Sequence, residues 1–269
     1  MPINKVVQDV DVCLHRFLLI LYHRSTIRAG MSELTEKNAS YSEGLKFYLG
    51  LNAEPVAVKL VKEGEEFPSG AERPDEQYSH CQAMFYARKG RCLKLLPEDQ
   101  KCHVGASALG MMPTPEKVID GEFHHNIGIH DSKEAAASMI AQRVDIGCRT
   151  AGEVVCPLNK ADFVPDVVVM ADIPEKFYWI VCASTAEKGG HAAYTMAPFQ
   201  CTCEDITVTP IVTGRPNMSM GCFGCRRRTD MKPEEMAMGI PYREIPGYLE
   251  HFARWQDGDK APMNRAKRD

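Results

Sequence analysis

The sequence predicts a single α+β domain, with a mixed β-sheet, flanking helices and a cysteine-rich C-terminal third. Two observations carry this prediction. Short β-branched segments alternate along the chain with segments of helical periodicity, a pattern typical of a sheet covered by helices. The chain has 269 residues, 44% of them apolar, so it is long enough to bury a sizeable core. We find no internal repeat and no linker rich in Gly, Ser or Pro.

The helix and strand signals follow one another in a definite order. Residues 62–76 are acidic and predict an exposed loop. Cys102 precedes a run of small residues, which predicts a helix that starts at a cysteine. The expected helices cover 40–50, 79–87, 102–110, a segment beginning at 114, 131–144, a segment beginning at 173, and 245–255; the expected strands cover 55–61, 92–96, 164–170 and 235–241.

We expect residues 1–35 to form an N-terminal extension outside the fold, 36–256 to form the domain, and 257–269 to be a charged tail. The most apolar stretch, 17–22, is flanked by basic residues and is far shorter than the roughly 20 residues that a membrane-spanning helix needs. A formal net charge of -4 argues against a broadly basic, nucleic-acid-binding surface. The sequence therefore predicts a cytoplasmic protein with neither membrane nor nucleic acid as partner.

Cysteine is the unusual feature of the composition. The chain has 11 cysteines, an odd number that cannot all pair, and such thiol content favours a reducing compartment where cysteine serves metal or redox chemistry. Cys13 lies in the expected extension. Burial as a small apolar side chain is an adequate explanation for four others: Cys92, Cys148, Cys156 and Cys182. Six cysteines remain as candidate ligands.

One interpretation of these six is a structural zinc site. Two closely spaced pairs, with 18 residues between them, supply four soft ligands in a spacing that resembles a zinc-closed hairpin. The four ligands would be Cys201, Cys203, Cys222 and Cys225.

The second interpretation is an iron–sulfur cluster, of the 4Fe–4S type, with one thiolate from each of four segments. Gly221 and Gly224 allow backbone N–H groups to approach sulfur closely. The arginine triplet 226–228 supplies positive charge that offsets an anionic cluster or substrate. The ligands in this interpretation are Cys81, Cys102, Cys203 and Cys222, with Cys201 and Cys225 as neighbouring thiols.

Several motifs, taken in order, resemble the uncharacterised prokaryotic family called domain of unknown function 169. The resemblance covers about residues 40–252, and its most distinctive segment is Gly-Cys-Phe-Gly-Cys-Arg at 221–226. It implies no activity, but the family is frequent in anaerobes, which suits an oxygen-sensitive cluster. The other matching segments are Cys-Gln-Ala at 81–83, Ala-Arg-Lys-Gly at 87–90, Leu-Gly at 109–110, Pro-Asp-Val-Val-Val at 165–169, Thr-Gly-Arg-Pro-Asn at 213–217 and Gly-Ile-Pro at 239–241.

The resemblance also bears on the ligands. Cys81, Cys102 and Cys222 fall on cysteine positions of the family, and either Cys201 or Cys203 fills the fourth. We therefore expect an iron–sulfur protein of anaerobic metabolism with redox or sulfur-related chemistry, while a non-catalytic regulatory or binding protein with structural zinc is the alternative. Arg215 and Arg226 are the expected contacts for a small anionic substrate, and a redox partner is the other expected interaction.

Overall fold

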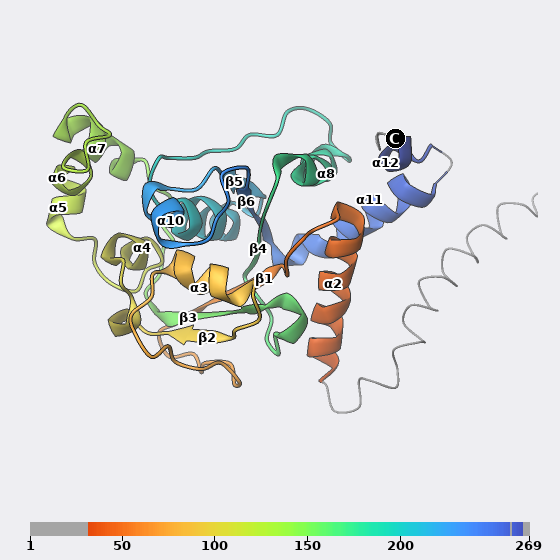
Figure 1. Ribbon diagram of the computed structural model, residues 1–269, viewed down its shortest axis with the longest axis horizontal. Coiled ribbons are helices and arrows are strands. Elements are labelled where there is room, and N and C mark those ends of the chain that lie inside the picture. The colour runs from red at the N-terminus through yellow and green to blue at the C-terminus, as the bar shows by residue number, and fades with distance from the viewer. Residues whose placement is uncertain (1–31, 259, 266–269) are drawn as a thin grey trace, which may run out of the picture.

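A computed structural model describes residues 32–258 and 260–265 (Figure 1). Its centre is one six-stranded sheet with the strand order β2-β3-β1-β4-β6-β5. The predicted α+β class is confirmed, but every pairing between neighbouring strands is antiparallel, so the sheet is not mixed. The strands are β1 (Val56–Lys62), β2 (Leu93–Leu95), β3 (Thr150–Pro157), β4 (Val167–Asp172), β5 (Asn217–Ser219) and β6 (Met236–Pro241).

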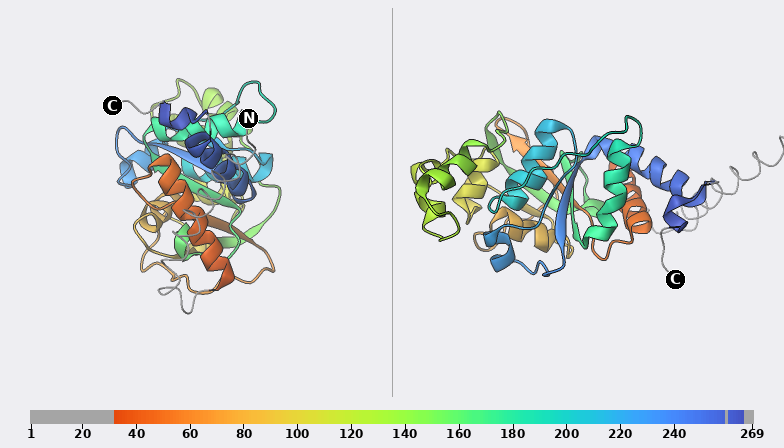
Figure 2. Two further views of the ribbon diagram at one scale, coloured as in Figure 1. Left: turned by 90° about the vertical axis from the view of Figure 1, so that its right-hand side faces the viewer. Right: turned by 90° about the horizontal axis from the view of Figure 1, so that it is seen from above.

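Helices cover both faces of this sheet, as the two turned views show (Figure 2). The α-helices are α2 (Glu33–Leu49), α3 (His80–Ala87), α4 (His103–Ala108), α5 (Glu116–Ile119), α6 (Glu122–His125), α7 (Lys133–Ala141), α8 (Pro174–Thr185), α9 (Thr209–Thr213), α10 (Phe223–Arg228), α11 (Ile245–Asp257) and α12 (Pro262–Arg265). Three short 3₁₀ helices and one π-helix complete the list: η1 (Pro97–Asp99), η2 (Leu158–Lys160), η4 (Tyr242–Glu244) and the π-helix η3 (Cys201–Val208).

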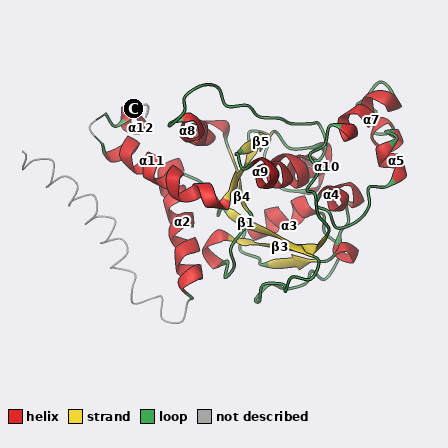
Figure 3. Ribbon diagram, turned by 180° about the vertical axis from the view of Figure 1, so that it is seen from behind, coloured by secondary structure: helices red, strands yellow, loops and turns green. Residues whose placement is uncertain are grey.

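The alternation of side chains along the strands divides the core into two layers. On β1, Val56, Val58 and Leu60 belong to one buried cluster, whereas Ala57 and Val61 belong to the other. Helices α2, α8 and α11 cover the second cluster. Helices α3, α4 and α10 (Figure 3) and the π-helix η3 cover the first, which contains Cys81, Cys203 and Cys225.

Most expected elements are present, and the differences have local causes. Ser32 caps α2, so this helix begins well before the predicted start at residue 40. The expected tail is not wholly separate from the fold, because α12 lies within it and Met263 is buried. Strand β3 was not predicted, since Gly152 and Glu153 interrupt its apolar pattern. The expectation for residues 1–31 lies outside the described residues. No helix of the described part is long and apolar enough to cross a membrane.

Candidate metal centre

Six cysteines come together on the α3 face of the sheet, and they are the six that the sequence singled out. Each lies at the N-terminal end of a helix, so four separate segments of the chain meet there. We call this group the cysteine centre: Cys81 in the first turn of α3, Cys102 as the cap of α4, Cys201 and Cys203 in η3, Cys222 as the cap of α10, and Cys225 within α10.

The sulfur atoms of this group interact directly. The Cys225 thiol is within hydrogen-bonding reach of the sulfurs of both Cys81 and Cys201. Cys102 and Cys203 lie side by side, each with its Sγ 3.6 Å from the point that a Cβ atom on Gly105 would occupy. The charges of Cys102, Cys222 and Cys81 all act on Cys203. The six sulfurs thus form one group, and both four-sulfur sets expected from the sequence are part of it.

Backbone amides point at these sulfurs. The N–H of Gly105 donates to Cys102 Sγ at 3.4 Å, and the N–H of Cys225 donates to Cys222 Sγ at 3.2 Å. Cys201 accepts from the amides of Gly221 and Cys222. Such donors stabilise thiolates and the sulfur ligands of metal clusters, because they compensate negative charge on sulfur. The N-terminal ends of the helices therefore give the centre an environment suited to anionic sulfur.

The pKa values of the thiols differ sharply within the group. The hydrogen bond from Cys225, aided by the Ser79 hydroxyl and by His80, lowers the pKa of Cys81 to about 6. Burial and the charge of Cys201 raise the pKa of Cys222 to about 11. Burial also raises the pKa of Cys203 well above its ordinary value, and the charge of Cys102 adds to this effect. The thiols resist ionising together, so a fully ionised group needs a cationic centre to balance it.

The π-helix η3 brings two of the cysteines to the centre. All eight of its residues are buried, and Gln200 precedes it with a left-handed φ of 66°. On β6, Gly239 lets the sheet approach this helix, because a Cβ atom there would lie 1.9 Å from the carbonyl oxygen of Ile206. Short π-helical segments occur frequently at functional sites. None of the helices expected from the sequence covers residues 201–208, and no local pattern there predicts a π-helix.

A buried polar network, which was not predicted from the sequence, lies next to the cysteine centre. His80 Nδ1 contacts Glu153 Oε2, and both side chains are almost fully buried. Burial opposes a charged imidazole, yet Glu153 outweighs burial and raises the pKa of His80. Gln100 donates to the second carboxylate oxygen of Glu153 at 2.8 Å, and His80 Nε2 lies 3.0 Å from Thr207 Oγ1 in η3. The network ties α3, β3 and η3 together beside Cys81.

Arg215 and Arg226, the expected contacts for an anionic substrate, lie in different surroundings. Arg226 donates to the backbone carbonyls of Met220, Lys232 and Glu235, so its guanidinium closes a loop. Arg215 is exposed and follows α9, on the order of 15–20 Å along the η3–α9 helix from its cysteines at 1.5 Å per residue. Arg228, by contrast, lies near enough for its charge to favour the thiolate of Cys102.

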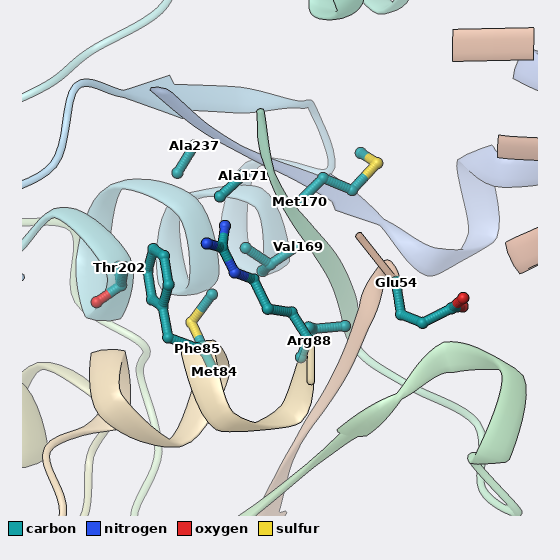
Figure 4. A pocket seen from close by; sticks show the side chains of 10 residues that line it. Glu54, Met84, Phe85, Arg88, Val169, Met170, Ala171, Thr202 and Ala237 are labelled. Atoms are coloured by element: carbon teal, nitrogen blue, oxygen red, sulfur yellow. The ribbon is translucent and has the colours of Figure 1, made fainter. Parts of the chain in front are cut away.

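A shallow hollow of about 280 Å³, which includes space open to solvent, lies beside the cysteine centre (Figure 4). Thr202, between two cysteines of η3, lines it together with Met84 and Phe85 of α3. The Arg88 guanidinium extends into this hollow, 4.4 Å from the centre of the Phe85 ring, and pairs with Glu235 at 3.0 Å. Its charge is therefore already balanced by a carboxylate.

The remaining cysteines lie elsewhere, and burial does not explain them all. Cys92 and Cys156 form a disulfide, which corrects the expectation that both are buried thiols. Cys148 is exposed, against expectation, and Cys182 is half-buried on α8. Cys13 lies outside the described residues. Within residues 32–258 and 260–265, no group of three or more His, Cys, Asp or Glu side chains is arranged so that it could hold a metal ion.

Comparisons with known proteins agree with the resemblance noted from the sequence. Residues 44–251 match the model of the family DUF169, which is described as an uncharacterised ArCR family. The chain is 32% identical over 209 residues to the uncharacterized protein MJ0308 of Methanocaldococcus jannaschii, covering 76% of this chain and 90% of that protein. No solved structure matches the chain.

Proposed function

This chain belongs to the DUF169 family, and we propose that it binds an iron–sulfur cluster in the cysteine centre. One observation carries the proposal: six cysteine sulfurs, delivered by the N-terminal ends of four helices, meet in one largely buried group. Buried thiols scattered at random through a core have no reason to interact with one another or to accept backbone N–H bonds. Cysteine thiolates hold iron–sulfur clusters, and hydrogen bonds to their sulfurs tune the cluster.

We assign one ligand to each of the four helices, namely Cys81, Cys102, Cys203 and Cys222. The sulfurs of Cys102 and Cys203 both lie beside Gly105, and the charge of Cys102 acts on Cys203. Cys201 and Cys225 are then the accompanying thiols. The positive charge of Arg228 favours the thiolate of Cys102 and so fits an anionic cluster.

When bound, such a cluster supplies one-electron transfer. With four cysteine ligands, every iron of a 4Fe–4S cluster would already be bound to the protein. An electron-transfer role therefore suits the assignment better than substrate binding at iron. Cys222 is half-buried, which brings one ligand of the cluster close to the protein surface. Oxygen-sensitive clusters and the eight free thiols of the described residues fit a reducing cytoplasm, which we propose as the location. The Cys92–Cys156 disulfide is the one feature that runs against this location, because a reducing compartment usually keeps such a pair as thiols.

The test is anoxic purification of the full chain, followed by measurement of iron, acid-labile sulfide and zinc per chain. We expect iron and sulfide in stoichiometric amounts, with a visible charge-transfer band and an electron paramagnetic resonance signal after reduction. Single serine variants of the four assigned ligands should lose iron, while C182S, which changes a half-buried free thiol on α8, should retain it. C201S and C225S should keep most of the iron.

Structural zinc is the competing assignment, and the same preparation separates the two. Its support is that Cys201 and Cys225 are in direct contact within the centre. Stoichiometric zinc without labile sulfide would overturn the cluster proposal. Loss of that zinc only in variants of Cys201, Cys203, Cys222 and Cys225 would then establish the zinc site.

A further inference from the structure

Cys222, which is half-buried, lies between exposed apolar residues in the sequence. Phe223, the first residue of α10, is 44% exposed, and Met220, just before the Cys222 cap, is 63% exposed. Large apolar side chains with such exposure often mark a protein interaction site when they lie close together. They flank the one half-buried cysteine of the 222–225 pair.

Unpaired positive charge lies on the same short helix. Arg227 and Arg228 are exposed, and within the described part of the chain neither side chain has an ion pair or a hydrogen bond. The nearby carboxylates are already engaged, because Asp230 pairs with Lys89 at 2.6 Å and Glu235 pairs with Arg88. Residues four apart share one face of a helix, so Arg227 lies on the face of Phe223. A chain of net charge -4 therefore carries a local positive patch beside its cysteine centre.

The backbone of this region is held in place. Arg226 donates to carbonyl groups at both ends of the loop, those of Met220 and Glu235. Gly221 has a φ of +88°, and a Cβ atom there would lie 2.7 Å from Met231 Sδ, so the chain turns tightly against its neighbours. A surface that is ordered before binding loses less entropy when a partner docks.

We propose that this surface, formed by Met220, Phe223, Arg227 and Arg228 and called the α10 surface below, docks a small acidic electron-transfer protein. The proposal rests on the cluster proposed above. The reduced partner gives up one electron and the oxidised cluster gains it, and no bond is formed or broken. Electron-transfer complexes use small interfaces, and complementary charge increases their association rate.

A nucleic acid is the other polyanion that arginines attract, and two features disfavour it. Nucleic-acid affinity grows with the number of phosphates neutralised, and only two unpaired arginines lie on this helix. The net charge of the chain also repels a long polyanion.

The test uses a reduced acidic flavodoxin as the probe and cluster-loaded full chain as the acceptor, mixed anoxically in a stopped-flow instrument. We expect the second-order rate of cluster reduction to fall as ionic strength rises. The variant R227E should react several-fold more slowly at low salt and lose much of that salt dependence. The control K117E changes the net charge equally at an exposed position on α5, and it should behave as wild type.

Two further measurements keep the outcomes separate. Iron and sulfide content, measured in every variant, tests the cluster itself; a chain without cluster contradicts the proposed function. Photoreduction by neutral deazaflavin, which needs no docking, should proceed equally in all cluster-loaded variants. If cluster is present but R227E and K117E react equally with flavodoxin, the α10 surface is not the docking site. Retardation of duplex DNA that depends on Arg227, without a flavodoxin effect, would likewise overturn the proposal.

Discussion

Cys102 and Cys203 both lie beside Gly105, with both sulfurs 3.6 Å from the point where a Cβ atom on that glycine would lie. These cysteines are about a hundred positions apart in the sequence, and they meet because α4 packs against η3. A methyl group fits this position at ordinary van der Waals distance, but it would contact the sulfurs of both assigned ligands.

Gly105→Ala should therefore have opposite effects on the metal-free and the metal-loaded protein. Without metal, alanine should stabilise α4 by about 0.5–1 kcal/mol, because glycine is a poor helix former. With metal, we expect less iron per chain. Thermal unfolding and iron analysis measure the two effects. Gly247→Ala on α11, where a Cβ atom meets nothing within 4 Å, is the matched control and should leave the iron content unchanged. Equal iron in both variants would show that the cluster does not use this space.

His80→Phe should destabilise the fold strongly, because it leaves the buried Glu153 carboxylate without its cationic partner. Removing one member of a buried ion pair costs about 3–5 kcal/mol. The double variant His80→Phe/Glu153→Leu should cost clearly less than the sum of the two single variants. Urea unfolding of the four proteins gives this coupling. Simple additivity would mean that the two side chains do not depend on each other.

Breaking the Cys92–Cys156 disulfide should lower the free energy of unfolding. The bond closes a loop between cysteines 64 positions apart, and loop-closure entropy predicts a loss of about 4 kcal/mol. Cys92→Ser/Cys156→Ser, compared with wild type by urea unfolding without reductant, measures the loss. Adding reductant should bring wild type to the stability of the variant. Intact-mass analysis under non-reducing conditions checks the bond itself, and a fully reduced mass would contradict it.

His124 should make the metal-free chain less stable in mild acid. Burial lowers its pKa from 6.5 to about 4, and its Nδ1 has no hydrogen-bond partner. Between these two values the unfolded chain binds the proton and the folded chain does not, so stability is full above pH 6.5 and falls as the pH drops toward 4. The loss is as much as about 3 kcal/mol.

His124→Phe removes the titrating group at a position that packs against Phe199. Its unfolding free energy, followed by urea titration from pH 7 to pH 4, should fall less steeply than that of wild type. An identical pH dependence in the two proteins would show that His124 does not titrate in this way.

Local signals were sufficient to predict much of this fold. Cys102 precedes small residues and does cap a helix, and the run that includes Val167–Met170 is a central strand. Strand β3 was missed because its buried Glu153 looks like a surface residue until His80, 73 positions away, is placed against it. No local rule carries information about such a distant partner.

In the candidate site, too, some features follow from local sequence signals and others from contacts between distant segments. The six cysteines were selected by residue type, spacing and the family resemblance, and their role as ligands stays a prediction. The contact of Cys225 with Cys81 depends on packing α10 against α3, which the sequence does not encode locally. The close approach of η3 to the sheet, which Gly239 on β6 allows, likewise depends on residues far apart in the sequence. The disulfide escaped prediction because spacing alone does not specify a pairing.

The six cysteines of the centre are spread over most of the described sequence, and this spread determines when during synthesis the centre can form. Cys81 and Cys225 are supplied by opposite ends of the domain, so a ribosome must synthesise most of the protein before the group is complete. Loading of the proposed cluster would then follow synthesis of α10, and truncated chains that end before α10 lack two of the six thiols. A bound cofactor at this position would report that both halves of the polypeptide have docked, and it would hold them together by mass action afterwards.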